Sequence, residues 1–169
     1  MDPLARTFVK LLAFDFLSLR YQPHPHGFCS SGPTFSRKGR SIFRAEAVGV
    51  VVERERKEGF LRFLVDDGTG CIPCILWLNH LSPSNRSSYL ARRNPSDLEL
   101  AAKHAADQAE GVQLGRLARV RGRVTHFRGS LQITVSCVTI ERDPNAEILH
   151  WLDCIRLATQ CYDQPPPRR

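Results

Sequence analysis

The stretch 47–77, AVGVVVERERKEGFLRFLVDDGTGCIPCILW, constrains the fold more than any other part of the chain. It completes a Val-rich run that begins at Ile42 and ends at Glu53, and it contains two further strand-like runs, 60–65 and 71–77, with apolar residues at alternate positions. Gly49 interrupts the first run, where glycine allows a long strand to bulge or bend. We therefore expect a bent first strand followed by two shorter ones.

The second and third runs are separated by residues 66–70, DDGTG. An Asp side chain can hold a turn by bonding to nearby backbone N–H groups, and Gly can supply the positive φ that turns require. These residues predict an antiparallel hairpin, and a bent strand followed by a hairpin is how a small barrel begins.

The rest of the chain supplies a helix and two more strands. Ser96 and Glu99 form a capping box, and the helix that follows should run from Asp97 to Glu110 and stop at Gly111. Its inward stripe is Leu98, Ala101, Ala102, Ala105 and Ala109. Strands are predicted at 117–127 and 131–140, with a short turn between them. This order predicts a mainly β fold, a five-stranded OB-fold barrel with a helix between its third and fourth strands and flanking N- and C-terminal helices.

Four segments are expected. Asp2 and Pro3 can open an N-terminal helix, with Leu4, Phe8, Leu11, Leu12 and Leu19 roughly on one face. A Pro-, His-, Gly- and Ser-rich loop or linker with a basic cluster should follow from 21 to 39. The predicted organisation is an N-terminal helix and basic linker (1–40), the barrel (41–142), a C-terminal partner-docking helix (143–162) and a Pro-rich tail (163–169).

Composition favours a polyanionic partner. The 169 residues, 42% of them hydrophobic, suit one domain, and 24 Lys and Arg against 17 Asp and Glu give a net charge of +7. Basic charge alone is weak evidence for nucleic-acid binding. No apolar run approaches the roughly 20 residues that span a bilayer, so we expect a soluble protein with reduced thiols.

Candidate chemical motifs are weak. Cys71 and Cys74 form a CxxC, but residues three apart in a strand face opposite sides, so we interpret them as one core and one surface thiol. His24 and His26 lie between prolines, which is typical of an extended exposed segment. The pair Asp66-Asp67 suffices as a turn and has no accompanying nucleophile. We expect no enzyme, no cofactor and no metal.

Trp77 lies on the opposite alternation from Ile72, Cys74 and Leu76, so its indole should face outward if those three face the core. Phe60, Arg62 and Leu64 should lie on the matching outer face of the second strand, which gives a mixed apolar and basic platform. In an OB-fold this face stacks bases of single strands. The alternative is that the indole only covers the barrel rim.

Three arginines, Arg119, Arg121 and Arg123, occupy alternate positions of the fourth strand and should project one charged row. Phe127 and Arg128 extend the row to the loop before the fifth strand, a usual contact region of OB-folds. The row could follow phosphates. Two alternatives are a solvated face and pairing with first-strand carboxylates such as Glu46 and Glu53.

The helix opened by Asp143 and Pro144 should continue to about Cys161. It carries an apolar stripe at three- and four-residue steps, which we predict to be a docking surface for a second protein. The stripe consists of Ile148, Trp151, Leu152, Ile155, Ala158 and Tyr162. The alternative is that it packs against the N-terminal helix of the same chain.

The motifs together resemble a known family. The strand ending in Arg-Glu-Arg, the sequence Val-Asp-Asp-x-Thr-Gly and the Cys-x-x-Cys strand ending at Trp77 are similar to the Stn subunit of the CST telomere-capping complex, itself similar to the middle subunit of replication protein A. RVRG at 119–122 and the helix after Asp143 and Pro144 continue the resemblance over most of the chain. Animal and fungal members carry winged-helix domains after the barrel, and the chain ends at Arg169 as plant members do, so the resemblance implies a plant source.

The resemblance implies a nuclear protein at chromosome telomeres that binds single-stranded G-rich telomeric DNA, with a Ten-like small OB-fold subunit docked on the C-terminal helix and a large Ctc-like subunit. Within the family, Trp77 falls on a position of the DNA face. Two alternatives stay open: a replication protein A-like subunit that acts at forks generally, and a protein adaptor that scarcely touches DNA.

Overall fold

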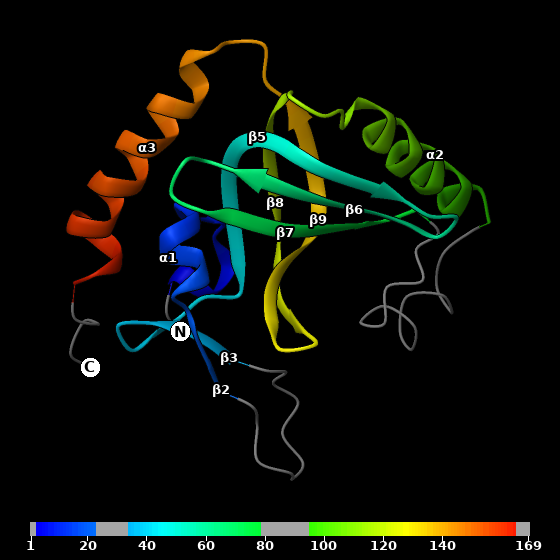
Figure 1. Ribbon diagram of the computed structural model, residues 1–169. Coiled ribbons are helices and arrows are strands. Elements are labelled where there is room, and N and C mark those ends of the chain that lie inside the picture. The colour runs from blue at the N-terminus through cyan, green and yellow to red at the C-terminus, as the bar shows by residue number, and fades with distance from the viewer. Residues whose placement is uncertain (1–2, 23–33, 79–94, 165–169) are drawn as a thin grey trace, which may run out of the picture.

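The computed structural model describes residues 3–22, 34–78 and 95–164. Strand β5 (Arg44–Arg56) takes part in both halves of a barrel, because its residues 44–50 pair with β8 (Leu117–Phe127) and residues 50–56 pair with β6 (Phe60–Asp66) (Figure 1). A Cβ added at Gly49 would lie 2.4 Å from the carbonyl oxygen of Asp66, so glycine is needed where the strands part. The register with β6 also shifts between Val51 and Glu53. The predicted bend is confirmed.

The barrel closes through β7 (Cys71–Trp77), which pairs antiparallel with β6 and parallel with β9 (Ser130–Ile140). Strand β9 pairs with β8 and β8 returns to β5, giving the order β5-β6-β7-β9-β8. The predicted five-stranded barrel is confirmed, and the strand bounds agree closely with the expected ones. Along β8 the alternate residues Ala118, Val120 and Val124 are buried, as the alternation predicts.

Helix α2 (Pro95–Gly111) separates β7 and β8 in sequence, as expected. Its Ala105 and Ala109 are buried, and Val112 just beyond its end is fully buried. Arg54 of β5 donates a hydrogen bond of 2.7 Å to the carbonyl oxygen of Val112, where a cation also complements the negative end of the helix. Small residues therefore let α2 lie close to the barrel.

The predicted single N-terminal helix over 4–19 is wrong. The segment forms a 3₁₀ turn, η1 (Pro3–Arg6), a short strand β1 (Val9–Lys10) and a short helix α1 (Ala13–Leu17). Strand β1 runs parallel to β5 and pairs with Ala45 and Glu46, an edge that β6 does not reach. Satisfying that open edge outweighs the helical pattern of the sequence. The apolar residues Leu4, Val9, Leu11, Ala13, Phe16 and Leu19 are nevertheless buried in the core.

The expected linker is also more ordered than predicted. Strands β2 (Arg20–Gln22), β3 (Thr34–Arg37) and β4 (Arg40–Ser41) form a separate three-stranded sheet. Its β3–β4 turn places Lys38 at φ 46° and Gly39 at φ 82°, the two positive values of a tight hairpin turn. His24 and His26 lie outside the described residues, as does 165–169 of the Pro-rich tail.

The turn at 66–70 forms as predicted. The backbone N–H of Gly68 donates to Asp66 Oδ1 at 2.7 Å, and that of Thr69 donates to Asp67 Oδ1 at 2.9 Å. The buried Asp67 also accepts a hydrogen bond of 2.7 Å from the backbone N–H of Ala13. The β6–β7 turn thereby holds the start of α1 as well as its own shape.

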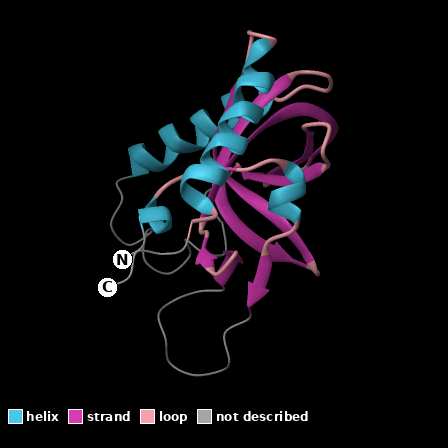
Figure 2. Ribbon diagram, turned by 90° about the vertical axis from the view of Figure 1, so that its left-hand side faces the viewer, coloured by secondary structure: helices cyan, strands magenta, loops and turns pink. Residues whose placement is uncertain are grey.

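The chain ends in helix α3 (Asn145–Leu157), which continues into the π-helical turn η2 (Ala158–Tyr162). The predicted C-terminal helix is confirmed. Figure 2 views the molecule from the α3 side, and the helix crosses in front of the strands. Within the described residues, no helix has the length and apolarity that crossing a membrane requires.

Gly49→Ala should destabilise the fold by about 1 to 3 kcal/mol, because the new Cβ would overpack against the β6 backbone. Urea unfolding followed by circular dichroism measures the change. Gly111→Ala is the matched control, since its Cβ would meet only Ile140 Cγ1 at 3.4 Å. Equal stability of the two variants would contradict the close approach at Gly49.

Candidate nucleic-acid and partner interfaces

Strands β6 and β7 carry a small aromatic and basic cluster on their outer side, here called the β6–β7 face (Phe60, Arg62 and Trp77). Phe60 and Trp77 are partners in register, with ring centroids 5.7 Å apart in a T-shaped arrangement. The Arg62 guanidinium carbon lies 5.5 Å from the Phe60 ring centroid. Ile72, Cys74 and Leu76 are buried, and Trp77 on the opposite alternation is half-buried, although Ile75 on the same alternation as Trp77 is only 5% exposed.

The thiols of the CxxC are separated by the same alternation. Cys71 is exposed and Cys74 is buried, which confirms the interpretation as one surface and one core thiol. Burial raises the pKa of Cys74 far above its ordinary value, so this thiol stays protonated and unreactive.

An exposed aromatic residue lies at the β8–β9 hairpin tip (Phe127 to Gly129). Phe127 is 47% exposed, and the Arg128 guanidinium carbon lies 5.2 Å from its ring centroid. Arg128 and Gly129 have φ of 49° and 86°, so they form the tight turn that this hairpin needs. The tip therefore presents a ring and a cation together.

The arginine row lies outward on β8 as predicted, but the structure does not bring it next to the β6–β7 face. Strand β8 pairs with β5 and β9, whereas Phe60 and Trp77 lie on β6 and β7. Strands β6 and β7 pass in front of β8 in Figure 1. Alternation along a strand predicts inward and outward sides but not the position of the strand around the barrel. The predicted residues thus belong to separate surfaces.

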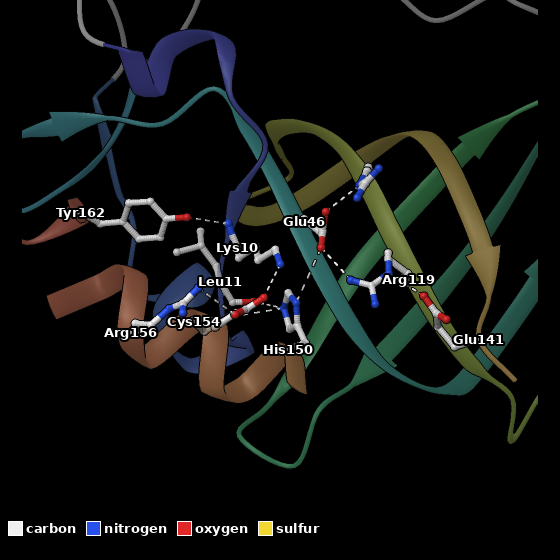
Figure 3. Close-up of polar contacts among 11 residues, drawn as sticks. Lys10, Leu11, Glu46, Arg119, Glu141, His150, Cys154, Arg156 and Tyr162 are labelled. Atoms are coloured by element: carbon white, nitrogen blue, oxygen red, sulfur yellow. Dashed lines mark hydrogen bonds and ion pairs between the residues drawn. The ribbon is translucent and has the colours of Figure 1, made fainter. Parts of the chain in front are cut away.

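Two arginines of the row are ion-paired (Figure 3). Arg119 Nη1 lies 2.7 Å from Glu46 Oε1 and its Nε lies 2.5 Å from Glu141 Oε1, while Arg121 Nε lies 2.6 Å from Glu46 Oε2. Burial raises the pKa of Glu46, but the hydrogen bonds from Arg121 and Arg119 outweigh burial and hold it below its ordinary value. Pairing with Glu46 is therefore confirmed for Arg119 and Arg121. Arg123 is exposed and makes no ion pair with any residue that the structure describes.

The inner side of α3 packs on the barrel and on β1. His150 is 2% exposed, its Nε2 lies 3.5 Å from the Leu11 carbonyl oxygen, and its Nδ1 lies 3.8 Å from Glu46 Oε1 (Figure 3). Burial lowers the pKa of His150, so the ring is neutral near pH 7. The buried Cys154 lies 3.3 Å from the same Nε2, and burial raises the pKa of its thiol to about 12.

Ion pairs hold the end of the helix to the N-terminal part of the chain. Asp163 Oδ1 lies 2.9 Å from Arg37 Nε, and its Oδ2 lies 2.7 Å from Lys38 Nζ. Arg37 Nη1 also lies 2.6 Å from Asp15 Oδ1. The basic cluster that sequence analysis assigned to a linker thus fixes the C-terminal helix.

The outer side of α3 is apolar and open. Ile148, Leu152 and Ile155 are 61%, 59% and 53% exposed, whereas Trp151 and Ala158 are half-buried. Tyr162 is 5% exposed and belongs to the core, so its assignment to the docking stripe is wrong. The steps of three and four residues follow the exposed side of the helix as far as Ile155. By Tyr162 the same steps have reached the side that faces the barrel.

An apolar groove of about 360 Å³ lies between this outer side and the β6–β7 turn, lined by Asp67, Gly68, Glu147, Ile148, Trp151, Leu152 and Ile155. Burial and the nearby charges of Asp67 and Asp66 raise the pKa of Glu147. Glu147 makes no ion pair with a cation in the described parts of the chain. The groove is therefore apolar at its centre and acidic at its rim.

The stacking contact between Tyr21 and His126 was not predicted from the sequence. The rings of Tyr21 on β2 and His126 on β8 stack at 4.2 Å with an interplanar angle of 5°, and Tyr21 also lies 5.6 Å from Phe35. This stack ties the three-stranded sheet to the β8–β9 hairpin. Residues so distant in sequence carry no periodic signal of their contact.

No protein-family model matches the chain. The "CST complex subunit STN1" of Arabidopsis thaliana is 44% identical over 160 residues, 94% of this chain and 94% of the relative. That of Ailuropoda melanoleuca is 30% identical over 169 residues, 98% of this chain and 44% of the relative.

Solved structures agree on the fold. The S. pombe Stn1-Ten1 complex contains a chain with a TM-score of 0.67 at 18% identity, covering 93% of this chain and 95% of that chain. A replication protein A heterotrimer bound to ssDNA contains one with a TM-score of 0.65 at 20% identity, covering 92% and 98%. The fold and its surfaces define a single-barrel OB-fold protein. With the sequence relatives, the chain belongs to the STN1 family of CST complex subunits.

Asp163→Asn should reduce stability at pH 7 by up to about 1 kcal/mol, as partly exposed ion pairs contribute. Hydrogen bonds from Arg37 lower the pKa of Asp163 from 3.8 to about 2. Because folding lowers this pKa, the ionised carboxylate stabilises the native state above pH 3.8, and the contribution is lost as pH falls through about 2. Urea midpoints of both proteins should converge over that window.

Asp107→Asn, at an exposed position of α2, is the matched control and should leave the midpoint unchanged at each pH. A stability difference for Asp163→Asn that is as large at pH 2 as at pH 7 would contradict the assignment of this ion pair.

Proposed function

We propose that the chain is the OB-fold subunit of a CST-type complex in the nucleus, where it protects and maintains telomeres by binding single-stranded DNA and a small OB-fold subunit. The observation that carries the proposal is the open apolar side of α3 on a barrel whose relatives are complex subunits. Apolar surface of this extent on one helix is typical of a protein interface.

Single-stranded DNA fits the β6–β7 face and the hairpin tip. Phe60, Trp77 and Phe127 offer rings for stacking, and Arg62 and Arg128 lie beside those rings as cations for the backbone. Few rings are available, so binding by the isolated chain should be weak. Membership in the STN1 family makes the G-rich telomeric strand the first ligand to test.

A small OB-fold subunit, Ten1-like, fits the outer side of α3. Its apolar residues would cover Ile148, Leu152 and Ile155, and a basic side chain would neutralise the rim formed by Asp67 and Glu147. Trp151 lines this groove beside the exposed apolar residues, so its half-buried ring would add apolar area to such an interface. A large Ctc-like subunit would complete the complex.

A protein adaptor with little DNA contact is the second candidate function. It is favoured by the pairing of Arg119 and Arg121 with Glu46, which removes two cations from those available to phosphates. A replication protein A-like role at forks shares the barrel and the same DNA faces. Binding of the isolated chain to single strands separates the adaptor from both DNA-binding functions.

Trp77→Ala should weaken binding to a short G-rich single strand about 5- to 150-fold, because one base-stacking contact contributes roughly 1 to 3 kcal/mol. Fluorescence anisotropy at low salt measures the affinity. Phe14→Ala, which removes an aromatic ring that is 67% exposed on α1, is the matched control and should bind as the parent does. Unchanged affinity of Trp77→Ala would exclude the β6–β7 face.

Leu152→Asp with Ile155→Asp should abolish co-purification with a Ten1-like subunit. Each apolar anchor of an interface contributes about 2 kcal/mol or more, which is roughly thirtyfold in affinity. Both side chains are more than half exposed, so the isolated variant should stay folded by circular dichroism. Leu114→Asp, at a position 62% exposed between α2 and β8 and outside the lining of the groove, is the control. Retained co-purification would place the docking surface elsewhere.

A further inference from the structure

Two arginines lie directly opposite each other on β5 and β8. Arg44 and Arg123 are partners in register, so their side chains leave the same outer face of the barrel, and both are exposed. Like charges in such a cross-strand pair destabilise a sheet. A pair of this kind therefore favours an anion that would neutralise both.

No carboxylate of the described residues neutralises this pair. Glu46, two positions along β5 on the same face, is already held by Arg119 and Arg121. The Arg44 guanidinium carbon instead lies 5.6 Å from the ring centroid of Phe8, which supports the side chain while leaving its N–H groups for a ligand.

The pair is continuous with the hairpin tip. Phe127 has the same outward alternation on β8 as Arg123 and lies four residues further along, about 13 Å at the usual rise of a strand. Between them Thr125 is half-buried and its hydroxyl lies 2.9 Å from that of Thr134, so no charge interrupts the face. A chain of phosphates that leaves Phe127 would meet Arg123 and Arg44 next.

We propose that Arg44 and Arg123 form a second phosphate-binding site, which extends the single-stranded nucleic-acid path from the hairpin tip onto the outer face of β5 and β8. The inference rests on the proposed DNA-binding function and adds a second side of the barrel to it. Paired guanidinium groups suit phosphate oxygens. The strand would then contact two sides of the barrel, with the β8–β9 hairpin at the turn between them.

The test compares the full chain with Arg44→Gln/Arg123→Gln. Affinity is measured against salt concentration for G-rich strands of about 6 and about 18 nucleotides, near the limits of what one OB barrel holds. Because each phosphate contact on a single strand contributes about 0.7 to the slope of log affinity against log salt, the longer strand should show a slope shallower by about 1.4. The shorter strand should bind unchanged.

Arg116→Gln/Arg142→Gln is the matched control. It also removes two positive charges, at the end of the β8–β9 pair that lies away from the hairpin tip. An equal slope change in both variants would overturn the site, because general charge would explain it. The single variants Arg44→Gln and Arg123→Gln should each make the slope for the longer strand shallower by about 0.7, and they test the site if the double variant folds poorly.

Two further outcomes are distinguishable. Failure of the parent chain to bind either strand would overturn the proposed DNA-binding function together with this site. Loss of polyglutamate binding in the glutamine variant, with unchanged DNA binding, would overturn the site in favour of an acidic protein segment. Thermal melting should show the glutamine variant at least as stable as the parent, since a repulsive pair has been removed.

Discussion

The buried carboxylate of Glu46 is the interaction on which the arrangement of this molecule depends. It is 2% exposed, yet it receives Arg119 and Arg121 from β8 and faces His150 from α3, while its backbone carbonyl accepts a hydrogen bond of 3.1 Å from the N–H of Leu11. A buried charge is costly unless it is paired and hydrogen-bonded. Three segments distant in sequence are thus held at one point of β5.

This pairing decides which cations remain for ligands. Glu46 and Glu141 together hold Arg119, and Glu46 holds Arg121, so both arginines tie β8 to β5 and are occupied by carboxylates of the chain itself. Arg123 and Arg44, further along the same face, have no such partner in the described residues. Strand β8 therefore contributes paired arginines near its start, at Arg119 and Arg121, and an exposed arginine without an ion pair in the described residues at Arg123.

The barrel could be predicted because its signals are local. Each signal lies within a few consecutive residues: the apolar alternation in 60–65, 71–77 and 117–127, and the turn residues 66–70. The structure has strands and a turn at these positions, as predicted. The N-terminal segment could not, because the open edge of β5 at Ala45 exists only once the barrel is formed, and pairing with it overrides the helical pattern. The positions of the candidate binding residues could likewise be predicted only in part. Alternation along each strand predicts that Trp77 and Arg121 lie on outer sides, but only the strand order of the closed barrel shows that these sides are separate surfaces.

Helix α3 shows why the two interfaces can act together. Its inner side packs on the barrel through the buried Ala146, His150 and Cys154, and contacts at Tyr162 and Asp163 fix the chain beyond it. The apolar residues Ile148, Leu152 and Ile155 therefore stay exposed on the other side. The surfaces proposed for nucleic acid are the β6–β7 face (Phe60, Arg62 and Trp77), at the opposite end of these strands from the β6–β7 turn that lines the groove, and the β8–β9 hairpin, which lies away from α3 in Figure 1. A partner bound to α3 would leave both of them open, and a barrel held by Glu46 would keep the interfaces in fixed relation.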